Sequence, residues 1–199
     1  SIKFKNVFLS LLGIGLLIFA VYLLLNKEIN NIYITGNNIL EEQEIYQNYA
    51  KSIKDKRSMF FIGRGMDYYS VLEGSLKLKE ISYIHCEAYA AGELKHGTIS
   101  LVEKGTPVLS IITDDDIKFK TLSNVKEVCA RGALSIIITN DPEMDKDIYE
   151  HMVVIPKVHE LINPLLAIIK CQLIAYYVAK LNGCDIDKPR NLAKSVTVE

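Results

Sequence analysis

Short apolar runs alternate with longer stretches of helical periodicity along most of the chain. The runs are six or seven residues long and rich in β-branched or aromatic residues, which is typical of buried strands. They cover Ser58–Gly63, Pro107–Thr113, Leu134–Thr139 and His151–Pro156. Apolar residues spaced three to four apart predict helices over residues 40–55, Asp67–His85, Asp114–Arg131 and Glu160–Asn182. This alternation predicts an α/β fold with a mostly parallel sheet.

The ends of two predicted helices carry recognisable signals. Asp114–Asp116 would place acidic residues at the positive end of a helix dipole, and Gly132 would end that helix. Pro164 suits the first turns of the last helix, and Gly183 suits its end. The stretch "GRG" at residues 63–65 joins a strand to a helix, which suits anions, although it lacks the full phosphate-loop pattern.

The segment Val7–Leu25 is apolar and carries no charge over 19 residues. As a helix it would be about 28 Å long, enough to span a bilayer. The segment would equally suit a helix buried on all sides in a domain or dimer core. Taken alone, the segment favours neither interpretation.

The composition limits the classes of partner. A chain of 199 residues suits one domain with a sizeable core. The formal net charge of -1 argues against nucleic acid, because no basic excess is available to neutralise phosphates. Four scattered cysteines show no metal-ligand spacing, so we expect no zinc site and a reducing compartment. These are Cys86, Cys129, Cys171 and Cys184.

One region carries polar residues that the fold does not require. Glu73, Lys77 and Glu80 are spaced four and three apart, which places them on one helix face. A solvated Glu–Lys ladder would have the same spacing. His96 follows in a turn bracketed by Gly92 and Gly97, where no regular apolar face covers it, and its ordinary pKa suits proton transfer.

Two long motifs resemble a known family. "EGSLKLKEISYIHCEAYAAGELKHG" and "DKPRNLAKSVTVE" resemble the C-terminal isomerase part of glucosamine-6-phosphate synthase, also called glutamine–fructose-6-phosphate aminotransferase (isomerising). The similarity runs from about Ser58 to Glu199. It implies the sugar isomerase (SIS) fold, a three-layer α/β sandwich in which helices flank a mostly parallel sheet.

The resemblance also implies a division of the chain. "SIK" at the start is similar to the "STK" that opens a buried helix in the family, which favours the buried interpretation of Val7–Leu25 over a membrane span. We therefore expect a buried N-terminal helix in residues 1–30, an SIS domain in residues 31–184 and a catalytic tail in residues 185–199.

The family makes glucosamine 6-phosphate from fructose 6-phosphate and ammonia released from glutamine, without metal or organic cofactor. By resemblance, Glu80 is the base that moves a proton between the first two carbons of the sugar, and Lys77 stabilises the enolate-like oxygen. Lys194 would form a Schiff base with the sugar carbonyl. The Ala193 backbone would lie along the sugar, and Glu73 would support Lys77 through an ion pair.

The resemblance further implies partners. His96 would open the sugar ring and reach the site of the neighbouring subunit, which predicts a homodimer with shared active sites. Ser1 would touch the sugar in the intact enzyme. A first SIS half with a phosphate-gripping Ser/Thr-rich loop and a glutaminase domain belong to the family but match nothing here, so we expect a chain that is incomplete by itself.

Two other interpretations stay open. The chain could be a non-catalytic module that binds sugar phosphate, or a membrane-anchored SIS protein. A binding module has no use for a Schiff-base lysine, so the presence of Glu80, His96 and Lys194 together favours an enzyme over such a module. We expect the enzyme to be cytoplasmic.

Overall fold

The computed structural model describes residues 38–190. Ser1, the predicted helix at Val7–Leu25, Ala193 and Lys194 lie outside the described residues. The chain divides into two units, Ser1–Gln43 and Glu44–Glu199, and the packing described below belongs to the second.

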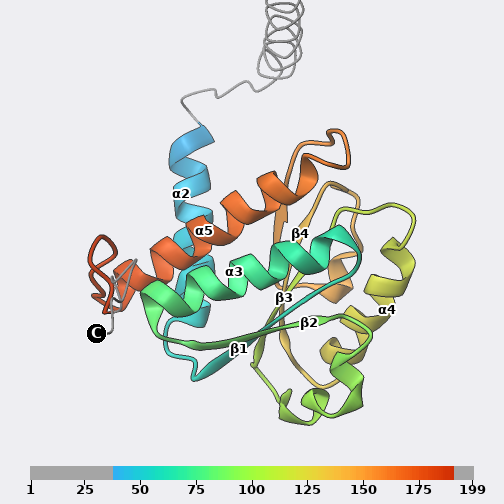
Figure 1. The fold of residues 1–199 in the computed structure, drawn as a ribbon, viewed down its shortest axis with the longest axis horizontal. Helices are drawn as coiled ribbons and strands as arrows, with labels where there is room; N and C mark the ends of the chain where they lie inside the picture. The colour runs from blue at the N-terminus through green and yellow to red at the C-terminus, as the bar shows by residue number, and fades with distance from the viewer. Residues whose placement is uncertain (1–37, 191–199) are drawn as a thin grey trace, which may run out of the picture. The chain divides into compact units, whose positions relative to one another are not determined.

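A five-stranded sheet with the order β2-β1-β3-β4-β5 forms the centre of the domain (Figure 1). Every neighbouring pair of strands is parallel. The strands are β1 (Ser58–Gly63), β2 (His85–Ala90), β3 (Pro107–Ile112), β4 (Leu134–Thr139) and β5 (His151–Val154). The direction of strand addition reverses between β1 and β3, as in doubly wound α/β folds.

Helices cover both faces of the sheet, which gives three layers. The helices are α2 (Asn38–Ile53), α3 (Met66–Ser82), α4 (Lys118–Cys129) and α5 (Asn163–Leu181). The short 3₁₀ helices are η1 (Leu94–His96), η2 (Thr98–Leu101) and η3 (Lys146–Ile148). Residues of α2, α3 and α5 share one core cluster with the sheet, whereas α4 and the 3₁₀ helices pack on the opposite face.

The alternation of side chains along β1 shows how one strand serves both cores. Phe61 points into the cluster with α3 and α5, and its neighbours Phe60 and Ile62 point into the cluster with α4. All three side chains are buried. A central parallel strand covered on both faces therefore reads as a continuous apolar run, which is why the sequence pattern located it.

The four strands and four helices expected from the sequence are confirmed, with three corrections. The helix expected to reach His85 ends at Ser82, because Tyr83 adopts a left-handed conformation with φ 62°. His85 instead begins β2, which the sequence analysis missed; as a partly exposed edge strand, β2 has no continuous apolar run. The helix expected from Asp114 begins at Lys118, so the acidic residues precede it.

Helices α3 and α5 are in close contact at a glycine. A Cβ built on Gly74 would lie 2.8 Å from the Cys171 Sγ atom, so only glycine fits there without movement. Within residues 38–190, α5 is the one helix that is long and apolar enough to cross a membrane by length and composition. Its buried side belongs to the main core cluster, which is typical of the central helix of a globular domain.

Candidate functional site

Glu73, Lys77 and Glu80 lie together on α3, as their spacing predicted. The Lys77 Nζ atom is 2.8 Å from Glu80 Oε2 and 3.5 Å from Glu73 Oε1. The three side chains remain 32–46% exposed, so solvent and ligands can reach them. We call these three residues the charged row.

The charged row fixes the protonation state of its lysine. The hydrogen bond to Glu80, and then the negative charges of Glu73 and Glu80, raise the pKa of Lys77 above its usual value. Lys77 is therefore a cation at neutral pH and is unsuited to act as an amine nucleophile. What it can supply is a positive charge beside a developing oxyanion.

The helix that carries the row has one buried and one exposed apolar side. Val71 and Leu78 are buried against the core. Leu72 and Leu76 are 39% exposed and line a groove between α3 and β2. Glu73 also lines this groove, so the row stands at the edge of a partly apolar surface.

The groove has a volume of about 590 Å³ and a mixed lining. It is lined by Tyr69, Leu72, Glu73, Ser75, Leu76, Lys79, Cys86, Glu87, Ala88 and Tyr89. Because β2 is an edge strand, no further strand of the described sheet covers it on this side. The groove is large enough for a small polar ligand or for a segment of chain.

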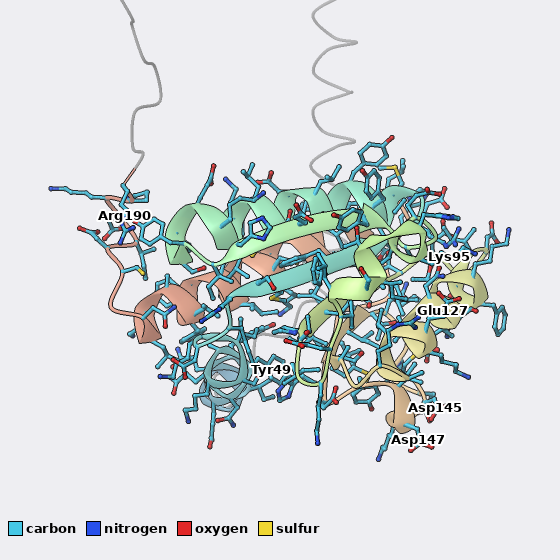
Figure 2. The ribbon with its side chains drawn as sticks, turned by 90° about the horizontal axis from the view of Figure 1, so that it is seen from below. Tyr49, Lys95, Glu127, Asp145, Asp147 and Arg190 are labelled. Carbon is cyan, nitrogen blue, oxygen red and sulfur yellow. The ribbon has the colours of Figure 1, made fainter. Side chains whose placement is uncertain are left out.

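His96 is exposed and ends η1, far from Glu80 in the same chain. Glu80 lies before the amino end of β2, and His96 lies beyond its carboxyl end. A strand of six residues is about 20 Å long, so a single chain does not bring the two side chains together. Figure 2 shows the neighbouring Lys95 and the tail residue Arg190 at opposite ends of the domain.

The turn at residues 63–65 does not form an anion site. The cavity beside it measures about 160 Å³ and is lined by three acidic residues, Asp67, Asp114 and Glu160. Asp67 is buried and accepts hydrogen bonds from the backbone N–H and hydroxyl of Thr113, and burial raises the pKa of its carboxyl group. Carboxylates at this position would repel a phosphate.

Arg64, in the same turn, points away from that cavity and supports the loop before His96. Its Nε and Nη2 atoms donate to the Asn124 side-chain oxygen at 3.3 and 3.0 Å. A Cβ on Gly92 would lie 2.6 Å from the Arg64 Nη2 atom, so the guanidinium packs against this glycine. Arg64 thus links α4 to the loop that leads to His96, a role that the sequence analysis missed.

The chain after α5 returns to the end of α3, the end nearest the charged row. Arg190 packs on the ring of Tyr83, with the guanidinium carbon 4.1 Å from the ring centre. Spacing in the sequence could not reveal this contact, because 107 positions separate the two residues.

Burial disfavours a thiol nucleophile at two of the cysteines. It raises the pKa of both Cys86 and Cys171 to about 12. Cys171 is buried between α3 and α5, where it packs as a small hydrophobic side chain.

The five-stranded parallel sheet flanked by helices is the architecture of a sugar-isomerase (SIS) type of domain. A family model described as "SIS domain" matches residues 52–180, and the chain belongs to this family. The chain is 52% identical over 177 residues to glutamine–fructose-6-phosphate aminotransferase (isomerizing) of Clostridium tetani, covering 88% of this chain and 29% of that protein. The enzyme of the same name from Shouchella clausii is 56% identical over 143 residues, or 72% of this chain and 23% of that protein.

Solved structures agree with the fold. The C-terminal domain of glucosamine-fructose-6-phosphate aminotransferase from Francisella tularensis matches with a TM-score of 0.72 and 36% identity, covering 81% of this chain and 46% of that chain. A phosphosugar isomerase described as putative, from Bacteroides fragilis, has a TM-score of 0.67 at 15% identity, which supports the fold alone. The chain spans between a fifth and a third of the length of these curated relatives.

Proposed function

We propose that this chain carries the isomerase chemistry of glutamine–fructose-6-phosphate aminotransferase, with fructose 6-phosphate as substrate. The observation that carries the proposal is the charged row, in which a cationic Lys77 lies 2.8 Å from Glu80 on an exposed helix face. Two curated relatives with more than half of the aligned residues identical bear the name of this enzyme, which supports the same assignment.

Lys194 begins the proposed reaction. Its neutral amine attacks the C2 carbonyl of the open sugar, and loss of water leaves a Schiff base. Ammonia then adds to C2 and expels the lysine amine, which regenerates the enzyme and leaves a sugar imine. The backbone of Ala193 guides the sugar, and Ser1 contributes a further contact.

Glu80 completes the isomerisation. Its carboxylate takes a proton from C1, the C–H electron pair forms a double bond between C1 and C2, and the imine nitrogen takes up a proton from solvent to give an enolamine. Glu80, whose carboxyl proton can exchange with solvent at this exposed position, then delivers a proton to C2, and the C1 hydroxyl loses its proton to solvent to become the aldehyde of glucosamine 6-phosphate. Lys77 stabilises the negative charge that develops on oxygen during these steps, and Glu73 holds Lys77 in place.

The separation of His96 from Glu80 supports a homodimer with shared active sites. Each chain would supply His96 to the sugar bound at the charged row of the other, where it would open the ring. A first SIS half that grips the phosphate and a glutaminase domain that releases ammonia are the further partners. We propose a cytoplasmic enzyme in which residues 1–30 form a buried helix, residues 31–184 the SIS domain and residues 185–199 the catalytic tail.

Deuterium exchange at the sugar tests the role of Glu80. A protein in which this chain is joined to the first SIS half is incubated with fructose 6-phosphate and an ammonium salt in D₂O, and deuterium at C1 and C2 is followed by NMR. We expect exchange by the wild type and a loss of about 10²- to 10⁴-fold in Glu80→Gln. Glu143→Gln, the same exchange at an exposed loop remote from α3, should keep the wild-type rate. Equal rates in both variants would contradict the proposal.

A further inference from the structure

Arg64 lies where three segments of the domain meet. It follows β1 directly, and its guanidinium Nε and Nη2 atoms both donate to the Asn124 side-chain oxygen on α4. Asn124 is 5% exposed, and its amide nitrogen donates to Glu127 at 3.4 Å, which directs its oxygen toward Arg64. Figure 2 shows Glu127 and Lys95, the neighbour of His96, at the same end of the domain. The far end of the Arg64 side chain is therefore fixed to α4.

The same guanidinium lies against Gly92, in the segment that follows β2. A Cβ atom built on Gly92 would lie 2.6, 3.3 and 3.6 Å from the Nη2, Cζ and Nη1 atoms of Arg64. A free arginine side chain would swing aside for a methyl group. This one is bonded to Asn124, so moving it would break those hydrogen bonds. Glycine at this position thus allows an approach that a larger residue would prevent.

The segment under the guanidinium leads to His96. The side chains of Ala91 and Leu94 are buried in the core cluster that contains residues of α4. The His96 N–H then donates to the Glu93 carbonyl at 3.0 Å, within the turn of η1. The contact with the guanidinium falls between the two buried side chains. Arg64 therefore adds a polar anchor to a segment that is otherwise held by apolar packing.

His96 needs such an anchor, because its own side chain is exposed and packs too little to fix its position. Under the proposed function, it acts on a sugar bound at the charged row of the neighbouring chain. A proton-transfer group must lie within about 3 Å of the atom it serves. A misplacement of about 1 Å can cost about 10²-fold in rate. The segment before His96 must therefore supply the rigidity that the side chain lacks.

We propose that Arg64 is a positioning residue for His96. By binding Asn124 and covering Gly92, it holds residues 91–97 in the conformation from which His96 opens the sugar ring. Arg64 itself does not touch the sugar. The inference rests on the proposed function, and it predicts a loss that is confined to ring opening and spares proton transfer by Glu80.

Two sugars separate ring opening from the later steps. Fructose 6-phosphate is mainly a closed furanose, which must be opened before it reacts. 5-Deoxyfructose 6-phosphate lacks the hydroxyl group that closes this ring, so it is always open and does not need His96. The protein that joins this chain to the first SIS half is given each sugar with an ammonium salt in D₂O, and deuterium at C1 is followed by NMR.

Two variants break the contact from opposite sides. We expect Arg64→Met and Gly92→Ala each to slow exchange into fructose 6-phosphate about 10- to 100-fold, and to change exchange into the open sugar less than about twofold. Arg64→Lys, which keeps the charge but not the planar fork, should recover only part of the rate. Arg131→Met is the matched control, because the Arg131 guanidinium donates to the Glu127 carbonyl near the amino end of β4. Both rates should stay unchanged in this control.

A measurement without sugar tests the anchoring by itself. Amide hydrogen exchange is measured in the chain alone, peptide by peptide, by mass spectrometry. Residues 91–97 should exchange about tenfold faster in Arg64→Met than in the wild type, whereas β3 in the middle of the sheet should be unchanged. Arg131→Met should match the wild type throughout.

The outcomes separate the positioning role from the chemistry. Equal losses on both sugars in Arg64→Met and Gly92→Ala, or wild-type rates on both, would overturn the role of Arg64 and leave the proposed function standing. A wild-type protein that exchanges neither sugar would refute the proposed function. Hydrogen exchange then decides about Arg64: unchanged exchange over residues 91–97 in Arg64→Met would overturn the anchoring, and faster exchange would support it.

Discussion

Replacing Gly74 by alanine tests the placement of the helix that carries the charged row. The new methyl group would lie 2.8 Å from the Cys171 Sγ atom and 3.0 Å from its Cβ atom. Cys171 is 2% exposed in the core, so its side chain has no open space to enter. Helices α3 and α5 must therefore separate by several tenths of an ångström, or the methyl group is not accommodated.

Two opposing free energies decide the result of Gly74→Ala. Overpacking a core typically costs about 1–3 kcal/mol, and alanine gains about 1 kcal/mol over glycine in a helix interior. We therefore expect a net destabilisation of about 0–2 kcal/mol in urea-induced unfolding. The sign of the coupling free energy between Gly74→Ala and Cys171→Ala is more informative, because Cys171→Ala removes the sulfur atom that the new methyl group contacts.

A double-mutant cycle isolates this contact. Cys171→Ala alone should destabilise the domain, and the double variant should be more stable than the sum of the two single changes predicts, by about 1–2 kcal/mol. Additive effects, or a Gly74→Ala protein that shows the full stabilisation expected from helix propensity, would mean that α3 and α5 do not meet at Gly74. The packing of α3 on α5 at Gly74 would then no longer explain why the charged row faces outward.

Three further changes test separate parts of the account. Lys77→Met should change the free energy of unfolding by at most about 1 kcal/mol, since the ion pairs of Lys77 are exposed. The same change should slow deuterium exchange into fructose 6-phosphate about 10²-fold. A loss of stability as large as the loss of exchange rate, with both expressed as free energies, would indicate a structural role for Lys77. Burial lowers the pKa of His151, so the unfolded chain binds more protons and wild-type stability falls as the pH drops below 6.5; unfolding of His151→Phe should lack this dependence between about pH 7 and 5. Asp67→Ala leaves the buried N–H of Thr113 without its hydrogen-bond acceptor and should lower the free energy of unfolding by about 2–4 kcal/mol. Thr113→Val keeps the hydrogen bond from the backbone N–H, so it should lower the free energy of unfolding by less in the same urea-induced unfolding.

The fold could be predicted from sequence wherever the side chains of a whole helix or strand share one pattern of burial. Strands β1, β3 and β4 are covered on both faces, so their apolar runs identified them. Strand β2 is a half-exposed edge, and its only fully buried residue is Cys86. The helix before it also appeared too long, because nothing in the local pattern indicates that Tyr83 adopts a positive φ.

The charged row could be predicted for a different reason. Glu73, Lys77 and Glu80 are neighbours on a helix, so their spacing alone brings them together. Contacts between distant segments left no such signal. The pairing of Arg190 with Tyr83 and the packing of Arg64 against Gly92 depend on how loops return across the domain.

Reductive trapping tests the central claim most directly. The chain is incubated with millimolar fructose 6-phosphate, cyanoborohydride is added, and the adduct is located by peptide mapping. Because reduction is irreversible and the product accumulates, weak binding of the sugar does not prevent detection. The account predicts an adduct on Lys194 that exceeds the adduct on the exposed Lys188 of the same tail at least about tenfold, since only an activated amine forms the Schiff base efficiently. Equal labelling of the two lysines by the folded protein would contradict it.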